Sequence, residues 1–217
     1  MPPTPSFKRR LLIWAGVMAG LCLLFYFLPL FHIVPLKAAR EQTAAAAFDA
    51  NAFVEKFWNT QLLPAQGRAV DVNELLAAFK KNPEEAVERF GHRLGLSTTV
   101  GFFVSGKGTI VAIDSRSVSI ASNEAGKVDV LIETGPVFGN TIRDGSGLLD
   151  VNDFPNSRDF NAISSEINRR VEERVFPLLK EKASKGASIQ FAGCVDITNP
   201  ETDLMPLRLV PILIKIP

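Results

Sequence analysis

The spacing of hydrophobic positions changes twice along the chain, and the changes divide it into three predicted parts. Residues 11–36 carry no charge and are mostly apolar, whereas residues 37–95 place apolar side chains three or four positions apart. From residue 96 onward, apolar and polar positions begin to alternate. These patterns predict a membrane anchor over residues 1–36, a helical segment over residues 37–95 and a β-barrel-like domain over residues 96–217.

The first part has the features of a transmembrane helix that is retained. Lys8, Arg9 and Arg10 precede an apolar run over residues 11–28, close to the about 20 residues that a bilayer-spanning helix needs. A cleaved signal peptide has a shorter apolar region, of about 7–15 residues, and a small-residue cleavage site that is missing here. Cys22 follows Leu21, where lipid attachment requires a small residue. We therefore expect an inner-membrane helix with its N-terminus in the cytoplasm and the main domain outside it.

The second part contains signals for three helices. Four apolar side chains predict a helix that ends near Pro64, with Trp58 packed in the core: Phe48, Phe53, Phe57 and Leu62. Asp71 is a good helix cap with Glu74 three positions later, and Asn82 is another, followed by Pro83. Two short helices are therefore expected between Asp71 and Gly91.

The third part combines strands with one long helix. Alternation over residues 117–120 and 127–133 predicts half-buried strands, and residues 109–113 are apolar on both faces. An apolar stripe predicts a helix over about residues 157–182, with a kink or an end at Pro177. Two further strands follow, near residues 188–195 and 207–216. The resulting fold class is α+β, with short helices and a small antiparallel OB-like barrel capped by the long helix.

The strand count conflicts with one rule of the OB-fold. With a further strand in the alternating region that begins at residue 96, four predicted strands precede the long helix, whereas in the OB-fold the helix usually comes before the fourth strand. The predicted barrel is therefore only close to an OB-fold.

Composition and charge exclude several classes of function. The formal net charge is +1, and without the three early basic residues the chain carries 21 Lys and Arg against 23 Asp and Glu. Such a balance argues against nucleic acid as a partner. Cys22 and Cys194 are expected on different sides of the membrane, so no disulfide is predicted and Cys194 is interpreted as a small buried residue. No clustered His and Cys ligands indicate zinc, and no cofactor motif is present.

Three features of the sequence could indicate ligand binding or catalysis, and the first two also have a structural interpretation. The stretch GFFVSGKG over residues 101–108 resembles a phosphate-binding loop, but a strand follows it instead of a helix, so Lys107 is interpreted as a turn residue. His92 follows a helix end, where the helix dipole favours a charged imidazole in a structural role. The acidic residues near residues 144–153 leave calcium binding or glycoside hydrolysis open, although they do not match an EF-hand.

Residues 135–160 hold the candidate site. This stretch contains four of the fifteen glycines and many polar side chains, and it joins the predicted strands to the long helix. Adjacent Arg143 and Asp144 are expected to point to different sides if the chain is extended there. Arg143 either binds backbone carbonyls or Asp153, or forks onto a carboxylate or sugar hydroxyls of a ligand. Arg143, Asp144 and Asp153 are therefore the tentative ligand-binding residues, and no catalytic or metal-binding residue is assigned.

The chain resembles an uncharacterised family of predicted bacterial periplasmic lipoproteins. Four stretches carry the resemblance, which covers nearly the whole chain: FHIVPL at 31–36, GKGTIVAID at 106–114, ETGPVFGNTIRDG at 133–145 and NDFPNSRDFNAISSEIN at 152–168. Members are often encoded beside sugar ABC transporters, which implies an accessory role near carbohydrate uptake. The family brings no catalytic residues that could be transferred to this chain.

These observations lead to one functional hypothesis with two alternatives. The main hypothesis is a non-enzymatic, membrane-anchored periplasmic module that binds a transporter component or a small sugar-like ligand. A carbohydrate-active enzyme with carboxylates near Asp144 and Asp153 is the first alternative. A purely structural envelope protein is the second.

Overall fold

The computed structural model describes residues 7–27, 48–123 and 126–217, and the chain divides into two compact units, Met1–Ala47 and Phe48–Pro217. In the first unit, α1 (Phe7–Phe27) is an uninterrupted helix. No helix within the described ranges is long and apolar enough to cross a bilayer, so the predicted transmembrane helix is not confirmed. The rest of the predicted anchor, residues 28–36, and the start of the predicted helical segment, residues 37–47, lie outside the described residues.

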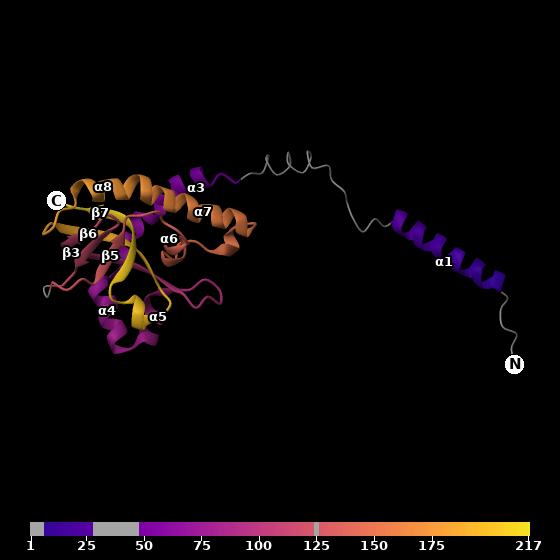
Figure 1. The fold of residues 1–217 in the computed structure, drawn as a ribbon, viewed down its shortest axis with the longest axis horizontal. Helices are drawn as coiled ribbons and strands as arrows, with labels where there is room; N and C mark the ends of the chain where they lie inside the picture. Colours follow the sequence, from indigo (N-terminus) through magenta and orange to yellow (C-terminus); the bar gives the residue numbers. More distant parts are fainter. Residues whose placement is uncertain (1–6, 28–47, 124–125) are drawn as a thin grey trace. The chain divides into compact units, whose positions relative to one another are not determined.

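Five strands of the second unit form a closed barrel (Figure 1). They are β3 (Val100–Ile113), β4 (Ser117–Ala121), β5 (Val130–Glu133), β6 (Ser188–Ile197) and β7 (Leu207–Lys215). The order around the barrel is β3, β4, β5, β7, β6 and back to β3. Only the β5–β7 pair of this ring is parallel, and its other pairs are antiparallel.

Strand β3 corrects the predicted strand count. It pairs with β6 from Val100↔Ile197 to Thr109↔Ser188, and its last part pairs with β4 from Thr109↔Ala121 onward. One long, curved strand therefore replaces the two that were predicted, and GFFVSGKG with Lys107 lies inside it rather than in a turn. Because only three barrel strands now precede the long helix, that helix comes before the fourth strand, as the OB-fold requires.

Two short strands pair with β3, and β7 accommodates a proline. β1 (Val70–Asp71) runs parallel to β3, and β2 (Gly91–His92) runs antiparallel to it. Pro211 of β7 lies opposite Gly193, where the register of the β6–β7 ladder shifts. A bulge is a position where a strand tolerates a proline, because no regular ladder hydrogen bond is lost there.

The predicted helices of the second part are confirmed. α3 (Ala50–Phe57) continues through a π-turn, η1 (Trp58–Leu62), into the 3₁₀ segment η2 (Pro64–Arg68), and Trp58 is buried as predicted. Asp71 caps α4 (Val72–Lys81), and Asn82 accepts hydrogen bonds from two backbone amides of α5 (Pro83–Phe90). The predicted capping residues therefore carry out that role.

The long helix consists of three consecutive parts that lie along the barrel (Figure 1). α7 (Ser157–Arg170) leads into the π-turn η4 (Val171–Val175) and then α8 (Phe176–Lys182). Pro177 has no N–H to donate, and the wider π-turn directly before it lets the helix continue. One face of the helix packs against α3 and β7. Its buried side chains join those of the strands in a single core, which includes Phe102, Ile110, Ile120, Ile132, Ile163, Ile167 and Leu209.

Three short elements occupy the connections. α6 (Thr141–Gly145) packs on β3 and β6, while η3 (Val151–Asp153) precedes α7 and α9 (Pro200–Asp203) precedes β7. A Cβ added at Gly101 of β3 would approach the Cα of Gly145 to 2.5 Å, so this pair of glycines lets α6 lie directly on the barrel. α6 therefore places residues 141–145 of the candidate stretch against the barrel wall.

Candidate functional site

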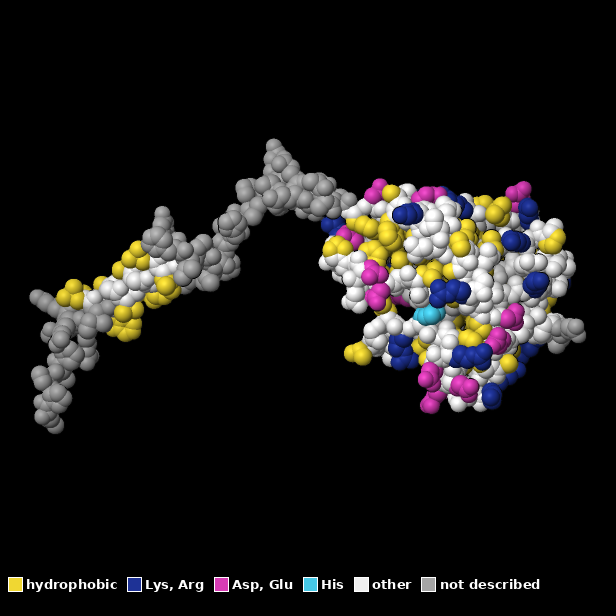
Figure 2. All heavy atoms as spheres, turned by 180° about the vertical axis from the view of Figure 1, so that it is seen from behind, with side chains coloured by type: hydrophobic (Ala, Val, Ile, Leu, Met, Phe, Trp, Pro, Cys, Tyr) yellow, Lys and Arg dark blue, Asp and Glu magenta, His cyan; other side chains and the backbone are white. Residues whose placement is uncertain are grey.

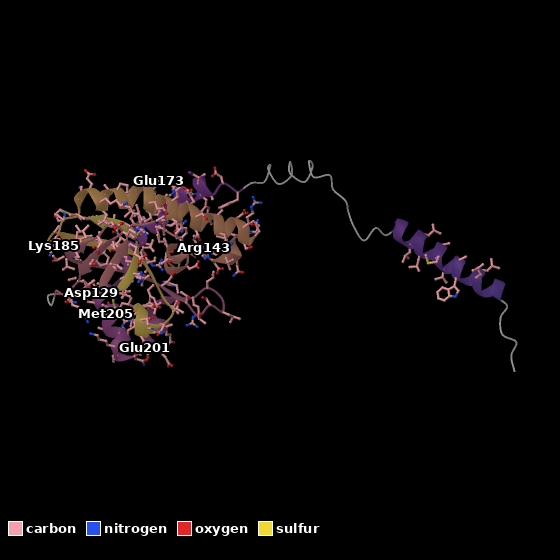
Figure 3. The ribbon with its side chains drawn as sticks, in the orientation of Figure 1. Asp129, Arg143, Glu173, Lys185, Glu201 and Met205 are labelled. Atoms are coloured by element: carbon pink, nitrogen blue, oxygen red, sulfur yellow. The ribbon has the colours of Figure 1, made fainter. Side chains whose placement is uncertain are left out.

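Arg143 lies on α6 and faces α7 (Figure 3). Its side chain is 2% exposed. One guanidinium nitrogen, Nη1, donates to the backbone oxygen of Phe160 at 3.2 Å and to Oδ1 of Asn161 at 3.0 Å. The guanidinium carbon also lies 3.8 Å from the centre of the Phe160 ring. These contacts fasten α6 to α7. The structural interpretation expected backbone carbonyls or Asp153 as partners and a link to the barrel; a backbone carbonyl is found, but it belongs to α7, and Asp153 is not a partner.

Asp144 pairs with the same guanidinium. Nε of Arg143 lies 2.6 Å from one carboxylate oxygen and Nη2 lies 3.1 Å from the other. The two side chains were expected to point to different sides if the chain were extended, and that condition is not met because the segment is helical. A bidentate pair of this kind fixes both groups in one plane.

Asp196 of β6 is a third member of this cluster, which the sequence did not reveal. Its carboxylate accepts a hydrogen bond of 2.6 Å from the hydroxyl of Thr141. Partial desolvation raises the pKa of Asp196, and the nearby negative charge of Asp144 raises it further, although the residue as a whole is exposed. Asp196 therefore brings a second carboxylate to α6, close enough to Asp144 to feel its charge.

Asp153 does not join this cluster. It lies on η3 and is exposed, and no hydrogen bond or ion pair links its side chain to another residue in the described part of the chain. The structure thus brings together two of the three predicted site residues, Arg143 and Asp144.

A polar cavity of about 350 Å³ opens between α7 and the loop before α6. We call it the α7 pocket. Its lining consists of loop residues and one face of α7: Val137, Phe138, Gly139, Asn140, Asn161, Ser164, Ser165, Asn168, Arg169 and Glu172. Asn161 also accepts the hydrogen bond from Arg143, so the pocket is continuous with the Arg143 cluster.

The inner wall of the α7 pocket is uncharged and incompletely hydrogen-bonded. Ser164 is only 4% exposed, and its hydroxyl has no partner among the residues described. Asn168 uses its amide nitrogen to donate to the backbone oxygen of Gly139 at 3.0 Å, which holds the loop to the helix. A buried hydroxyl without a partner is unfavourable unless a bound molecule satisfies it.

The rim combines an aromatic ring with charges that are already engaged. Phe138 is 81% exposed. Glu172 accepts a hydrogen bond of 2.7 Å from the backbone amide of Val137, and Arg169 pairs with Glu166 and Glu173. The pocket therefore offers amide and hydroxyl groups beside an exposed ring, rather than a free charge.

The inner residues of this pocket were missed because each was considered as part of a helix. Asn161, Ser164 and Asn168 are three or four positions apart and lie along one face of α7. The sequence signal that could have identified them is a row of polar residues at helical spacing, next to the apolar row that packs on the core.

The predictions for metal binding, Cys194 and His92 concern residues outside the α7 pocket. Within the described ranges, no group of three or more His, Cys, Asp and Glu side chains is arranged to hold a metal ion. Cys194 is fully buried and burial raises the pKa of its thiol, in agreement with its interpretation as a small buried residue. The expectation of a charged imidazole at His92 was wrong in direction, because burial, followed by the charge of Arg68, lowers its pKa.

The barrel order, the parallel β5–β7 pair and the helix before the fourth strand define an OB-fold protein. A solved OB-fold protein from Thermotoga maritima is similar, with 26% sequence identity and a TM-score of 0.69 over 79% of this chain and 99% of that one. None of the curated proteins compared matches the chain. Residues 21–215 match a family model, and the chain belongs to that family, which is described as predicted periplasmic lipoprotein (DUF2291). The family description supports the predicted periplasmic location.

Proposed function

We propose that this protein is a non-enzymatic periplasmic module, held at the inner membrane by its N-terminal segment, that binds a small uncharged polar ligand. The α7 pocket is the observation that carries the proposal. Its inner wall presents the unpartnered Ser164 hydroxyl together with the Asn161 and Asn168 amides. Such groups match the hydroxyls of a sugar, and the exposed Phe138 ring supplies an apolar face.

The ligand hypothesis is tested by thermal melting with a panel of mono- and disaccharides. We expect at least one sugar to raise the melting temperature in a saturable way, because a ligand bound only by the folded state stabilises it. Ser164→Ala should leave the unliganded protein as stable as before or more stable, because it removes a buried hydroxyl without a partner. The same change should reduce the sugar-induced shift.

Ser115→Ala is the matched control, because Ser115 is exposed in the turn between β3 and β4. Its ligand response should equal that of the unaltered protein. If no sugar shifts the melting temperature, the ligand hypothesis fails and a purely structural envelope role is supported. Calcium should be included in the same screen.

Attachment to the membrane is a separate part of the proposal. The basic residues before the apolar N-terminal run support a retained anchor, and Leu21 before Cys22 argues against lipidation. Mass spectrometry of the N-terminus from membrane fractions tests this. An intact start supports retention, whereas a chain that begins at a lipid-modified Cys22, or after residue 36, contradicts it.

A transporter component is the partner that we propose on the basis of the family resemblance. Crosslinking in intact cells, followed by purification of the full chain, should recover a periplasmic binding protein or a permease of a sugar ABC transporter. If several crosslinkers recover neither of these proteins, the accessory role is contradicted. The sugar hypothesis is decided separately, by the melting screen.

A specific observation favours an enzyme as the second candidate. Asp196, whose pKa is raised, lies beside Asp144, which Arg143 holds, and glycosidases use one protonated and one ionised carboxyl group. The pair differs from the predicted one, because Asp196 replaces Asp153. This candidate predicts hydrolysis of an oligosaccharide that Asp196→Asn abolishes, and a broad substrate screen without turnover would eliminate it.

A further inference from the structure

A second, smaller cavity of about 170 Å³ lies near the opposite end of α6 from the α7 pocket, and unlike that pocket it is lined by several basic side chains. We call it the His92 pocket. Its basic lining comes from three elements: Arg68 at the end of η2, Arg89 in the last turn of α5, and His92 on β2. The other lining residues are Ala65, Val70, Phe90, Phe103, Ser146 and Leu148, none of which is acidic.

The basic groups of this pocket are poorly neutralised. Within the described part of the chain, the Arg68 side chain forms no ion pair or hydrogen bond, and the His92 ring forms no hydrogen bond. Arg89 pairs with Glu74 at 3.2 Å, where both side chains are largely exposed, and its guanidinium carbon lies 4.5 Å from the centre of the Phe90 ring. Figure 2 shows the histidine colour in the middle of one face of the domain, between Lys and Arg side chains.

The position of the imidazole is fixed by its surroundings. His92 pairs with Gly101 in the β2–β3 ladder. Gly147, whose φ is +63°, lies so close to the ring that a Cβ there would come within 2.5 Å of its Nδ1 and Cε1 atoms. The floor beneath includes Val70 and Phe103, which are 9% and 5% exposed. The ring and the floor are therefore organised before any ligand arrives.

We propose that the His92 pocket binds a small oxyanion, a carboxylate or phosphate group that Arg68, Arg89 and His92 contact together. Arginine forks match both groups, and these clustered cations, of which Arg89 alone has a carboxylate partner in the described residues, repel one another until an anion is present. A cavity of about 170 Å³ accommodates a free anion or one with a short apolar tail against Val70 and Phe103. This proposal does not depend on the α7 pocket.

The binding test uses the full chain in detergent, titrated calorimetrically with inorganic phosphate and with propionate at constant ionic strength set by chloride. We expect at least one of the two to bind at a single saturable site. Arg68→Gln should weaken the binding of that anion about tenfold, which is the effect of losing one charge-assisted hydrogen bond. Arg116→Gln removes the same charge from an exposed turn and should leave the affinity unchanged.

The two anions distinguish the sources of the oxyanion. Preference for phosphate assigns a phosphate ligand, and preference for propionate assigns a carboxylate whose tail contacts Phe103. No saturable binding of either anion overturns the proposal. Equal weakening by Arg68→Gln and Arg116→Gln also overturns it, because that result indicates diffuse attraction rather than a site.

A second readout follows the imidazole directly by NMR in a His32→Gln background, which leaves His92 as the single histidine. Arg68 and Arg89 are the charged groups that line the pocket with it. A bound anion stabilises the imidazolium, so the pKa of His92 should rise from its lowered value when the anion saturates the protein. An unchanged pKa at saturation would show that the anion binds elsewhere.

Discussion

Asp129 shows how strongly one side chain can hold a turn of this barrel. It is completely buried, and its carboxylate accepts hydrogen bonds from the amide of Ser122 at 2.9 Å, the hydroxyl of Ser122 at 2.6 Å and the side-chain amide of Asn123 at 2.7 Å. These bonds join the end of β4 to the start of β5. Asp129 therefore closes the hairpin by bonding the donors at its tip.

Replacing this carboxylate should be costly. Asp129→Ala removes a buried carboxylate that accepts three hydrogen bonds, and we expect it to lower the free energy of unfolding by about 3 kcal/mol. Chemical denaturation measures the loss. Asp114→Ala, at the exposed turn between β3 and β4, removes one contact of 3.3 Å with Ser117 and should cost less than about 1 kcal/mol. Equal losses in the two variants would contradict the structural role of Asp129.

The alternating pattern was misleading at Asp129. Alternation with Val128 and Val130 placed Asp129 on the exposed face of a strand, but the strand begins at Val130 and the carboxylate turns inward. Arg143 was recognised from the sequence, whereas its partners Phe160 and Asn161 were not, because they are 17 and 18 residues away and meet it only in the fold. Single residues can be selected from sequence, but their partners depend on the tertiary structure.

At the scale of elements, α3 and α7 are joined by an arginine that is almost fully buried. Arg170 is 1% exposed, and it pairs with Glu55 of α3 and, at 3.1 Å, with Glu166 of its own helix. Arg174 reaches the same Glu55 carboxylate at 2.8 Å. Hydrogen bonds from Arg174, then from Arg170, lower the pKa of Glu55 from 4.5 to about 2.

This contact predicts a defined pH dependence. A carboxyl group whose pKa is lowered by folding stabilises the protein fully above its unfolded pKa, and the contribution is lost as the pH falls toward the folded pKa. The stability difference between the unaltered protein and Glu55→Gln should therefore be largest above about pH 5 and decrease between pH 4.5 and about 2. Denaturation curves across this range measure it.

Glu181→Gln is the control for this pair. Glu181 is exposed on α8 and takes part in no ion pair within the described residues. Its replacement should have a small effect at every pH. A difference for Glu55→Gln that stays constant from pH 6 to pH 2 would disprove the proposed linkage between α3 and α7.

Helices were easier to predict than strands because their signals are local. Capping residues and apolar spacing indicated α4, α5 and the helix from Ser157 to Lys182. β3 was predicted as two strands, with Lys107 in a turn between them. In the structure Gly106 and Gly108 lie inside the strand, where neighbouring side chains and backbone leave no space for a Cβ. That crowding arises from β4, β6 and α4, which are distant in sequence.

At the scale of the whole molecule, the second unit has a core of its own. Its buried cluster begins at Val54 and ends at Ile214, and all five barrel strands contribute to it. We therefore predict that a fragment of residues 48–217 folds by itself. Its thermal unfolding, followed by circular dichroism, should be cooperative, with a midpoint within about 5 °C of the full chain.

A shorter fragment tests whether closure of the barrel is needed. Residues 48–187 lack β6 and β7, which leaves β3 and β5 without partners on one side. This fragment should show no cooperative transition. Failure of the longer fragment to unfold cooperatively would instead show that the N-terminal unit contributes to folding.

The barrel class was predictable, whereas its closure and both pockets were not. Alternating positions indicated a small barrel, but the parallel β5–β7 pair and the β3–β6 ladder depend on pairing between distant segments. The α7 pocket likewise combines a loop with a helix that begins 17 residues after Asn140. The pocket lies partly in the predicted stretch over residues 135–160 and partly on the helix after it, and both are rich in polar residues. Which of these residues line the pocket could be determined only from the structure.

The β3–β6 ladder also determines when the barrel can close and its strand edges are no longer exposed to aggregation. It joins residues 100–109 to residues 188–197, so the ring cannot close until nearly the entire polypeptide is available. A chain delivered N-terminus first presents one side of β3 as an open edge throughout the passage of the intervening residues. Pairing over such a separation is also intrinsically slow. The interval between delivery of β3 and delivery of β6 is therefore when aggregation competes most strongly with folding.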